Sequence, residues 1–252
     1  MTENKAIYFE QLNGIRFIAV LLVLLDHWLI PINPFSFLGH LGVVIFFVLS
    51  GFLITRILFQ NADDCRQNHS SILVKIIRFM YRRSLRIFPI YFLLLLIGLV
   101  FSLSNFKNLW PYLVFYLPNF YIMTKATWLG IWDHLWSLAV EEQYYLFFPY
   151  FILLIAPRRY PLLFILMLLI GLGTRFGFYA LVNPAIQEQN WMWWYVNPFA
   201  ALDCFGLGGI LAYLFHYKQN YFQSVKFLKV GLIVSLIAFL AILNLGELTI
   251  FQ

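Results

Sequence analysis

Apolar residues fill most of the chain in long runs, and short segments between the runs hold most of the charged positions. Because roughly 20 apolar residues cross a bilayer as a helix, the runs predict seven membrane-spanning helices. They fall near 14–32, 40–58, 85–104, 136–156, 161–182, 197–217 and 228–250. The predicted fold class is therefore all-α, a polytopic transmembrane helical bundle.

An eighth apolar run, residues 109–123, is shorter and has a proline near each end. The positive charges test whether it crosses, since cytoplasmic loops carry the excess of Lys and Arg. If the N-terminus is cytoplasmic and this run dips in and returns, all of the 17 Lys and Arg residues except Lys107, Lys125 and Arg175 lie on the inner side. We therefore predict a re-entrant or interfacial segment and a multi-pass protein with a cytoplasmic N-terminus.

Composition agrees with this pattern. The chain is 62% hydrophobic and 11% charged, with a mean hydropathy of +0.80, which excludes an ordinary soluble domain. The net charge of +6 follows the predicted topology, so it does not indicate nucleic-acid binding. Cys65 and Cys204 lie in a charged loop and in an apolar run, so we expect neither a disulfide nor a metal site.

The connection between the second and third predicted spans, residues 59–84, is basic. Within it Lys75, Arg78 and Arg82 recur every three or four residues, opposite apolar residues such as Leu73. This spacing predicts a cytoplasmic basic amphipathic helix at the inner membrane surface. One interpretation is an anchor to anionic lipid headgroups, and the other is an anion site that continues into the third span.

Six ionisable side chains lie deep in the predicted spans, where each costs about 2.5–3.5 kcal/mol to insert. They are Asp26, His27, Glu141, Glu142, Arg175 and Asp203. At a rise of about 1.5 Å per residue, four helices bring all six to a similar depth in the outer half of the membrane. One interpretation is a set of pairs that fix helix order, such as Arg175 with Asp203 or Glu142. Another is a reaction centre with His27 as its general base.

Two kinds of chemistry fit a histidine and carboxylates above a basic inner face. A proton-coupled transporter or exporter would use His27 and Glu142 as a relay. A transferase would bind an anionic donor at the inner arginines and react at the histidine. Arg83 and Arg86 project from one helical face at the predicted mouth of the third span, level with Arg16, and guanidinium groups bind phosphates. Their concentration at one entrance favours the transferase.

Five motifs together carry a family resemblance. They are "LNGIRFIAVLLVLLDHW", "FFVLSGF", "RRSLRIFP", "WSLAVEEQ" and "LDCFGLGGILAYL". As a set they resemble the acyltransferase type 3 family of integral membrane acyltransferases, and the resemblance covers nearly the whole chain. It implies transfer of an acyl group, usually acetyl from cytoplasmic acetyl-CoA, to a hydroxyl of a surface or lipid-linked carbohydrate, with no metal. The expected location is the bacterial inner membrane.

The resemblance also implies roles for individual residues. Arg16, Arg83 and Arg86 match the positions that handle the donor, His27 matches the essential histidine, and Glu142 matches the glutamate of "WSLAVEEQ". His27 would deprotonate the acceptor hydroxyl with Glu142 orienting it, or would form an acyl-histidine intermediate.

Further residues are expected to bind substrate or to support the site. They are Asp26, Glu141, Ser50, Arg175 and Asp203, with the Ser50 hydroxyl a candidate to line the pantetheine path. Members of the family usually have more spans than seven. We therefore expect a single acyltransferase domain over residues 1–252, incomplete at its C-terminus, with membrane lipids around it and any extracytoplasmic partner on a separate chain.

Overall fold

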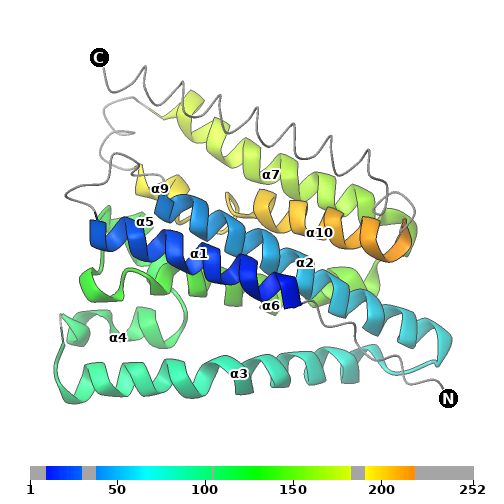
Figure 1. Ribbon diagram of the computed structural model, residues 1–252, viewed down its shortest axis with the longest axis horizontal. Coiled ribbons are helices and arrows are strands. Elements are labelled where there is room, and N and C mark those ends of the chain that lie inside the picture. The colour runs from blue at the N-terminus through cyan, green and yellow to red at the C-terminus, as the bar shows by residue number, and fades with distance from the viewer. Residues whose placement is uncertain (1–9, 30–37, 104, 183–190, 219–252) are drawn as a thin grey trace.

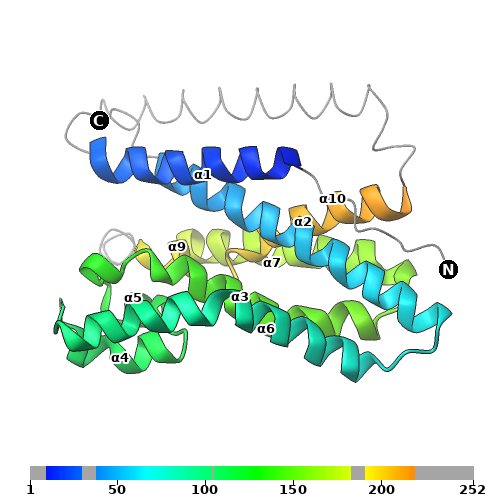
Figure 2. The ribbon, with the colours of Figure 1, turned by 60° about the horizontal axis from the view of Figure 1, so that its bottom comes forward.

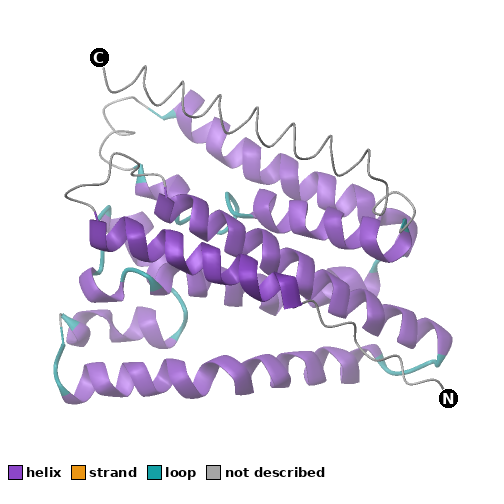
Figure 3. Ribbon diagram, in the orientation of Figure 1, coloured by secondary structure: helices purple, strands orange, loops and turns teal. Residues whose placement is uncertain are grey.

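The computed structural model describes residues 10–29, 38–103, 105–182 and 191–218. Within these ranges every regular element is helical (Figure 3), which confirms the all-α class for them. The longer helices are α1 (Glu10–Leu29), α2 (Leu38–Gln67), α3 (Ile72–Val100), α6 (Leu135–Leu154), α7 (Tyr160–Leu181) and α10 (Leu202–Tyr217). The shorter elements are α4 (Phe106–Val114), α5 (Pro118–Lys125), α9 (Met192–Tyr195) and the 3-10 turns η1 (Gly130–Trp132) and η2 (Pro157–Arg159).

The longer helices run side by side along the molecule and alternate in direction (Figures 1 and 2). We call the end where α1 ends and α2 begins the distal end, and the opposite end the proximal end. α3 ends and α6 begins at the distal end, where α4, α5 and α9 also lie (Figure 1). The bundle therefore gathers its short α-helices at one end, on the side that the predicted topology assigns to the outer face.

Three helical segments among the described residues are long and apolar enough to cross a membrane. They are α2, α3 and Pro157–Leu181. α3 buries only 17% of its most apolar window inside the protein, so the remaining apolar surface needs lipid to cover it. The chain is therefore an integral membrane protein. The total of seven spans stays a prediction, and the run near 228–250 lies outside the described residues.

The basic segment 59–84 is not a separate loop. Its residues complete α2 and begin α3, and a short turn at 68–71 joins the two helices. An ion pair between Lys75 and Asp64 fastens the helices across the turn. The predicted basic helix forms as the first part of α3, because neither glycine nor proline interrupts the helical spacing before Pro89.

The short apolar run at 109–123 forms α4 and α5 rather than one crossing helix, as its prolines and the charge count predicted. The chain turns between them, where Tyr116 adopts a left-handed conformation with φ of 56°. The hydroxyl of Tyr91 in α3 donates to the Leu113 carbonyl over 2.6 Å. Both short helices thus stay at the distal end.

Helices α2 and α10 approach closely because glycines face the partner backbone. A methyl group built on Gly208 would lie 2.2 Å from the Val48 carbonyl oxygen, and one built on Gly51 would lie 2.5 Å from that of Phe205. Small residues allow this approach in membrane helices. The Tyr144 ring of α6 stacks on Phe205 with centroids 4.0 Å apart, so α2, α6 and α10 share one core.

Candidate active site

His27 lies near the distal end of α1, and its side chain is exposed. Its Nδ1 is 2.8 Å from the Val23 carbonyl oxygen, one helical turn earlier. A carbonyl oxygen can only accept, so Nδ1 carries the hydrogen of this bond, and Nε2 is the unprotonated nitrogen of the neutral ring. The backbone of α1 therefore sets the tautomer that a general base needs.

The N-terminus of α6 brings two further titratable groups to His27. Asp133 and His134 both interact with it electrostatically. The Asp133 carboxylate accepts a hydrogen bond from the Leu129 amide, which fixes it within the turn. Burial raises the pKa of Asp133 and lowers the pKa of His134. Each group is thus shifted toward its neutral form beside the histidine.

Glu142 lies on α6, two turns further along than His134. Its electrostatic neighbours are Arg83 and Glu141, and its buried Oε1 has no hydrogen-bond partner among the described residues. Within the same ranges no hydrogen bond or ion pair joins Glu142 to His27. The predicted role of Glu142 in orienting the histidine stays a prediction.

Glu141 is the point where four helices meet. The Ser50 hydroxyl of α2 donates to its carboxylate, and Arg16 of α1 and Arg83 of α3 both act on it electrostatically. The Arg83 guanidinium lies over the ring of Tyr145, 4.3 Å from its centroid. Tyr145 follows Glu141 by four residues and so shares its face of α6. The cation, the ring and the carboxylate form one polar group inside the bundle.

Arg83 lies further along its helix than the predicted span, which begins near residue 85, would place it. Since α3 begins at Ile72 rather than near residue 85, Arg83 is already about three turns inside the helix. Its side chain is half-buried, whereas that of Arg86 one turn further is exposed. The predicted donor pair therefore presents one guanidinium to the carboxylates of α6 and the other to the surroundings.

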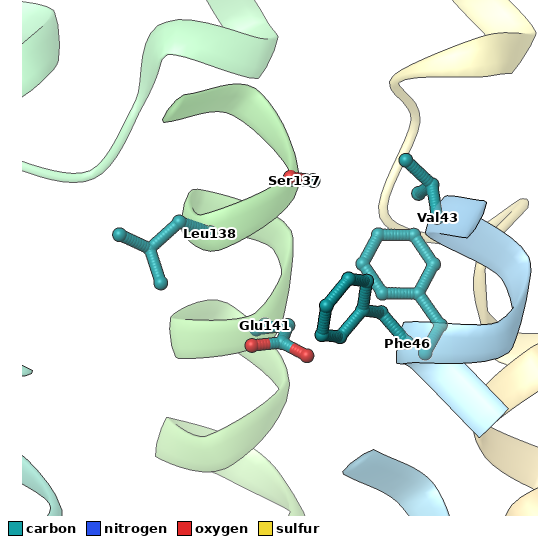
Figure 4. A pocket seen from close by; sticks show the side chains of 6 residues that line it. Val43, Phe46, Ser137, Leu138 and Glu141 are labelled. Atoms are coloured by element: carbon teal, nitrogen blue, oxygen red, sulfur yellow. The ribbon is translucent and has the colours of Figure 1, made fainter. Parts of the chain in front are cut away.

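A pocket of about 200 Å³ lies between α2 and α6. Its lining is Val43, Phe46, Phe47, Ser137, Leu138 and Glu141. Figure 4 shows the Glu141 carboxylate beside the Phe46 ring. The pocket is thus mostly apolar with a single carboxylate, and it can hold a slender chain that carries few polar groups.

Arg175 of α7 and Asp203 of α10 form an ion pair, in which one guanidinium nitrogen donates to Oδ1 over 3.3 Å and the other contacts Oδ2. This is one of the interhelical pairs that the sequence allowed. Asp26 packs elsewhere, against Gly39 of α2. The six ionisable residues that share a predicted depth therefore separate into three groups, on α1, on α6 and between α7 and α10. Nowhere in the described ranges do three His, Cys, Asp or Glu side chains converge as a metal site requires.

Residues 9–250 match the sequence profile of a family described as an acyltransferase domain. The chain belongs to this acyltransferase family. A Staphylococcus aureus (strain COL) relative with the provisional name of an O-acetyltransferase is 31% identical over 250 residues, covering 89% of this chain and 38% of the relative. The peptidoglycan O-acetyltransferase OatA of Listeria monocytogenes is 31% identical over 182 residues, covering 66% and 28%.

The O-acetyltransferase OatA of another S. aureus strain is 29% identical over 224 residues, covering 82% of this chain and 35% of the relative. No solved structure matches. The acyltransferase domain described here thus spans 38% of the length of the first of these relatives.

Within this acyltransferase domain, α6 connects the two parts of the site. Its N-terminus faces His27, and its middle carries the carboxylates beside Arg83. Sequence reasoning missed Asp133, because its proximity to His27 depends on how α1 docks against the turn before α6. It also missed Tyr145, although the spacing of four residues from Glu141 is visible in the sequence.

Proposed function

We propose that the protein transfers an acyl group, acetyl by default, from cytoplasmic acyl-CoA to a hydroxyl group of a surface or lipid-linked carbohydrate. The match of residues 9–250 to the acyltransferase domain, together with relatives named as O-acetyltransferases, carries this proposal. A carbohydrate acceptor is proposed because the Listeria relative is named for peptidoglycan.

The donor is proposed to bind through its phosphates to Arg16, Arg83 and Arg86. Guanidinium groups form charge-assisted, often bidentate hydrogen bonds with phosphate oxygens. Arg16 and Arg83 come from different helices yet act on the same carboxylate, Glu141, so their side chains share one neighbourhood. The exposed Arg86 is one turn further along α3 than Arg83 and is proposed to extend the same phosphate site.

The pantetheine arm is proposed to lie in the pocket between α2 and α6. The apolar walls from Phe46 and Phe47 suit its methylene groups, and Glu141 offers an acceptor for an amide N–H. The Ser50 hydroxyl already donates to Glu141, which would hold the carboxylate at the edge of this path. The pocket lies on α6 between the arginines and the end of the helix that faces His27.

In the reaction itself, Nε2 of His27 accepts the proton of the acceptor hydroxyl as the oxygen attacks the thioester carbonyl. The tetrahedral intermediate collapses, the carbon–sulfur bond breaks, and the CoA thiolate takes the proton back from the imidazolium. The Val23 carbonyl holds Nδ1–H throughout. The alternative in which Nε2 attacks the thioester first would give an acyl-histidine, and the same tautomer serves both routes.

Four other residues receive supporting roles. Glu142 is proposed to accept a hydrogen bond from bound substrate, since its Oε1 is buried without a partner among the described residues. Asp26, next to His27, is proposed to support the base electrostatically. The pair of Arg175 with Asp203 holds α7 to α10, and we propose that it keeps the distal end in register.

The protein is proposed to be a multi-pass component of a bacterial inner membrane with its N-terminus in the cytoplasm. This orientation places the basic first part of α3 against anionic headgroups and the distal end outside the cytoplasm. Acyl groups would thus pass from a cytoplasmic donor to an extracytoplasmic glycan, either directly or through a separate partner.

The test compares substitutions of the proposed base, His27, with substitution of a second exposed histidine, His69. His27→Gln and His27→Ala should each reduce acetyl transfer by about 10²- to 10⁴-fold, while His69→Ala should leave it unchanged. His69 is exposed in the proximal turn between α2 and α3, at the opposite end from His27. Transfer is measured with labelled acetyl-CoA in membranes, and ester acetyl groups on surface glycans are measured by proton NMR.

Protein abundance in the membrane controls for misfolding of each variant. Equal acetyl transfer by the wild-type protein and His27→Gln would contradict a base at His27. Proton flux coupled to solute movement without acyl transfer would instead favour the transporter.

A further inference from the structure

Three aromatic side chains from two separate segments gather at the distal end. They are Trp128, before η1, Trp191, directly before α9, and Tyr195, the last residue of α9, and we call them the aromatic cluster. Trp128 lies 6.1 Å from Trp191 and 6.2 Å from Tyr195, and Trp191 lies 5.7 Å from Tyr195, each pair edge to face. In these contacts the edge of one ring packs against the face of another. Trp191 nevertheless keeps 41% of its surface exposed.

The aromatic cluster is anchored to the bundle through Tyr195. The Tyr195 ring lies 5.0 Å from that of Trp136 in α6 and 5.2 Å from that of His40 in α2. Burial, assisted by the charge of Asp26, raises the pKa of Tyr195 to about 12. Its hydroxyl therefore stays protonated and can donate a hydrogen bond at any physiological pH.

The electrostatic contact between Tyr195 and Asp26 also locates the cluster relative to the proposed base. Asp26 precedes His27 on α1, and its carboxylate fills the space above Gly39 at the start of α2. His27 in turn acts on His134, two residues before the Trp136 that contacts Tyr195. Tyr195 is thus linked to the neighbours of His27 along two helices, through Asp26 on α1 and through Trp136 and His134 at the start of α6.

A belt of tryptophans at the membrane interface is the simpler reading of such residues. A belt explains Trp110, which is 48% exposed and belongs to α4, a helix beside α3 (Figures 1 and 2). It does not require rings from two distant segments, at Trp128 and at α9, to meet next to the carboxylate of Asp26 and the imidazole of His40. Aromatic faces with a few fixed polar groups are instead typical of a ligand site.

A pyranose ring matches this combination. Its C–H faces are apolar and pack on aromatic rings, while its hydroxyl groups need donors and acceptors around its edge. We propose that the aromatic cluster binds a pyranose unit of the acceptor glycan by stacking on Trp191, so that a hydroxyl of that sugar meets Nε2 of His27. This inference rests on the proposed function, because it assigns the acceptor subsite of the same reaction.

The experiment measures transfer from labelled acetyl-CoA in detergent-solubilised membranes of cells that make the protein. The acceptor is a soluble oligosaccharide of N-acetylglucosamine and N-acetylmuramic acid at varied concentration. Trp191→Ala should raise the acceptor KM about tenfold, the scale on which loss of one stacking ring weakens binding in other systems. The KM for acetyl-CoA should change less than twofold, and Trp191→Phe should restore most of the acceptor affinity.

Trp110→Ala is the matched control, since it removes another exposed distal tryptophan outside the aromatic cluster. It should leave the acceptor KM unchanged. If Trp191→Ala keeps the wild-type acceptor KM, or if Trp110→Ala raises it equally, the acceptor subsite is overturned while the proposed reaction stands. If membranes with the wild-type protein transfer no more acetyl than membranes that lack it, the proposed function fails and this inference fails with it.

Discussion

The close packing of α2 against α10 makes a quantitative prediction about Gly208. A methyl group there would lie 2.2 Å from the Val48 carbonyl oxygen and 2.6 Å from the Phe52 nitrogen. Both atoms belong to the α2 backbone, which cannot rotate away as a side chain can. Because ordinary carbon contacts need roughly 3.5–4.0 Å, the two helices would have to separate by about 1 Å.

The expected cost follows from this clash. Overpacking a tight core typically costs about 1–3 kcal/mol, and the separation also weakens the neighbouring contacts. Alanine in a helix interior is about 0.5–1 kcal/mol more favourable than glycine, which offsets part of the loss. Gly208→Ala should therefore destabilise the protein by about 1–2 kcal/mol, or roughly 2–8 °C at about 2–4 °C per kcal/mol for a chain of this size.

Gly173→Ala provides the matched control in α7. Nothing lies within 4 Å of a methyl group built on Gly173, so this variant gains the helix propensity without a clash and should be slightly more stable than the wild type. Thermal unfolding in detergent, followed by tryptophan fluorescence, gives the comparison. If Gly208→Ala melts as high as Gly173→Ala, then α2 and α10 do not pack through their glycines as described.

Two further predictions concern charged groups. Arg175→Met should destabilise the protein by about 3–5 kcal/mol, because it leaves Asp203 inside the bundle without its ion pair. Adding Asp203→Leu should recover much of this loss in a double-mutant cycle, whereas the exposed control Arg82→Ala should change stability by less than about 0.5 kcal/mol. Asp133→Asn keeps an acceptor for the Leu129 amide but removes a carboxyl whose pKa burial raises. Because the folded state holds this proton more tightly than the unfolded state, the free energy of unfolding of the wild type should fall as pH rises through the raised pKa. That of Asp133→Asn should fall less. Unfolding measured from acidic to neutral pH gives the comparison.

Much of the architecture could be predicted from the sequence because membrane helices obey strong length and charge rules. The prolines and the distribution of Lys and Arg indicated that 109–123 does not cross, and the structure breaks it into α4 and α5. The pair of Arg175 with Asp203 was one of the options, since isolated charges in a bilayer need partners. The start of α3 at Ile72 was harder to predict than its end. A hydropathy window stops at charged residues such as Arg82 and Arg83, although the helix continues through them.

The contacts of His27 could not be predicted in the same way. Depth along a helix follows from sequence position, but the direction of a side chain depends on how the helix is rotated and docked. The depth argument placed Glu142 and His27 at one level, whereas the structure turns Glu142 toward Arg83 and brings Asp133 to the histidine. No pattern within α1 indicates that Val23 would accept the hydrogen of Nδ1.

The neighbours of His27 and of Arg83 are both carried by α6, the helix that contains "WSLAVEEQ". From His134 to Glu142 the helix rises about 12 Å, so one rigid element carries the group that faces His27 and the carboxylate that faces Arg83. The distance from Arg83, a proposed donor contact on α3, to the proposed base His27 is therefore set largely by α6 rather than by loops. A substrate that reaches from Arg83 to His27 would have to match this length of helix. The packing of α6 on α2, with Tyr144 stacked on Phe205 of α10, holds the helix in place.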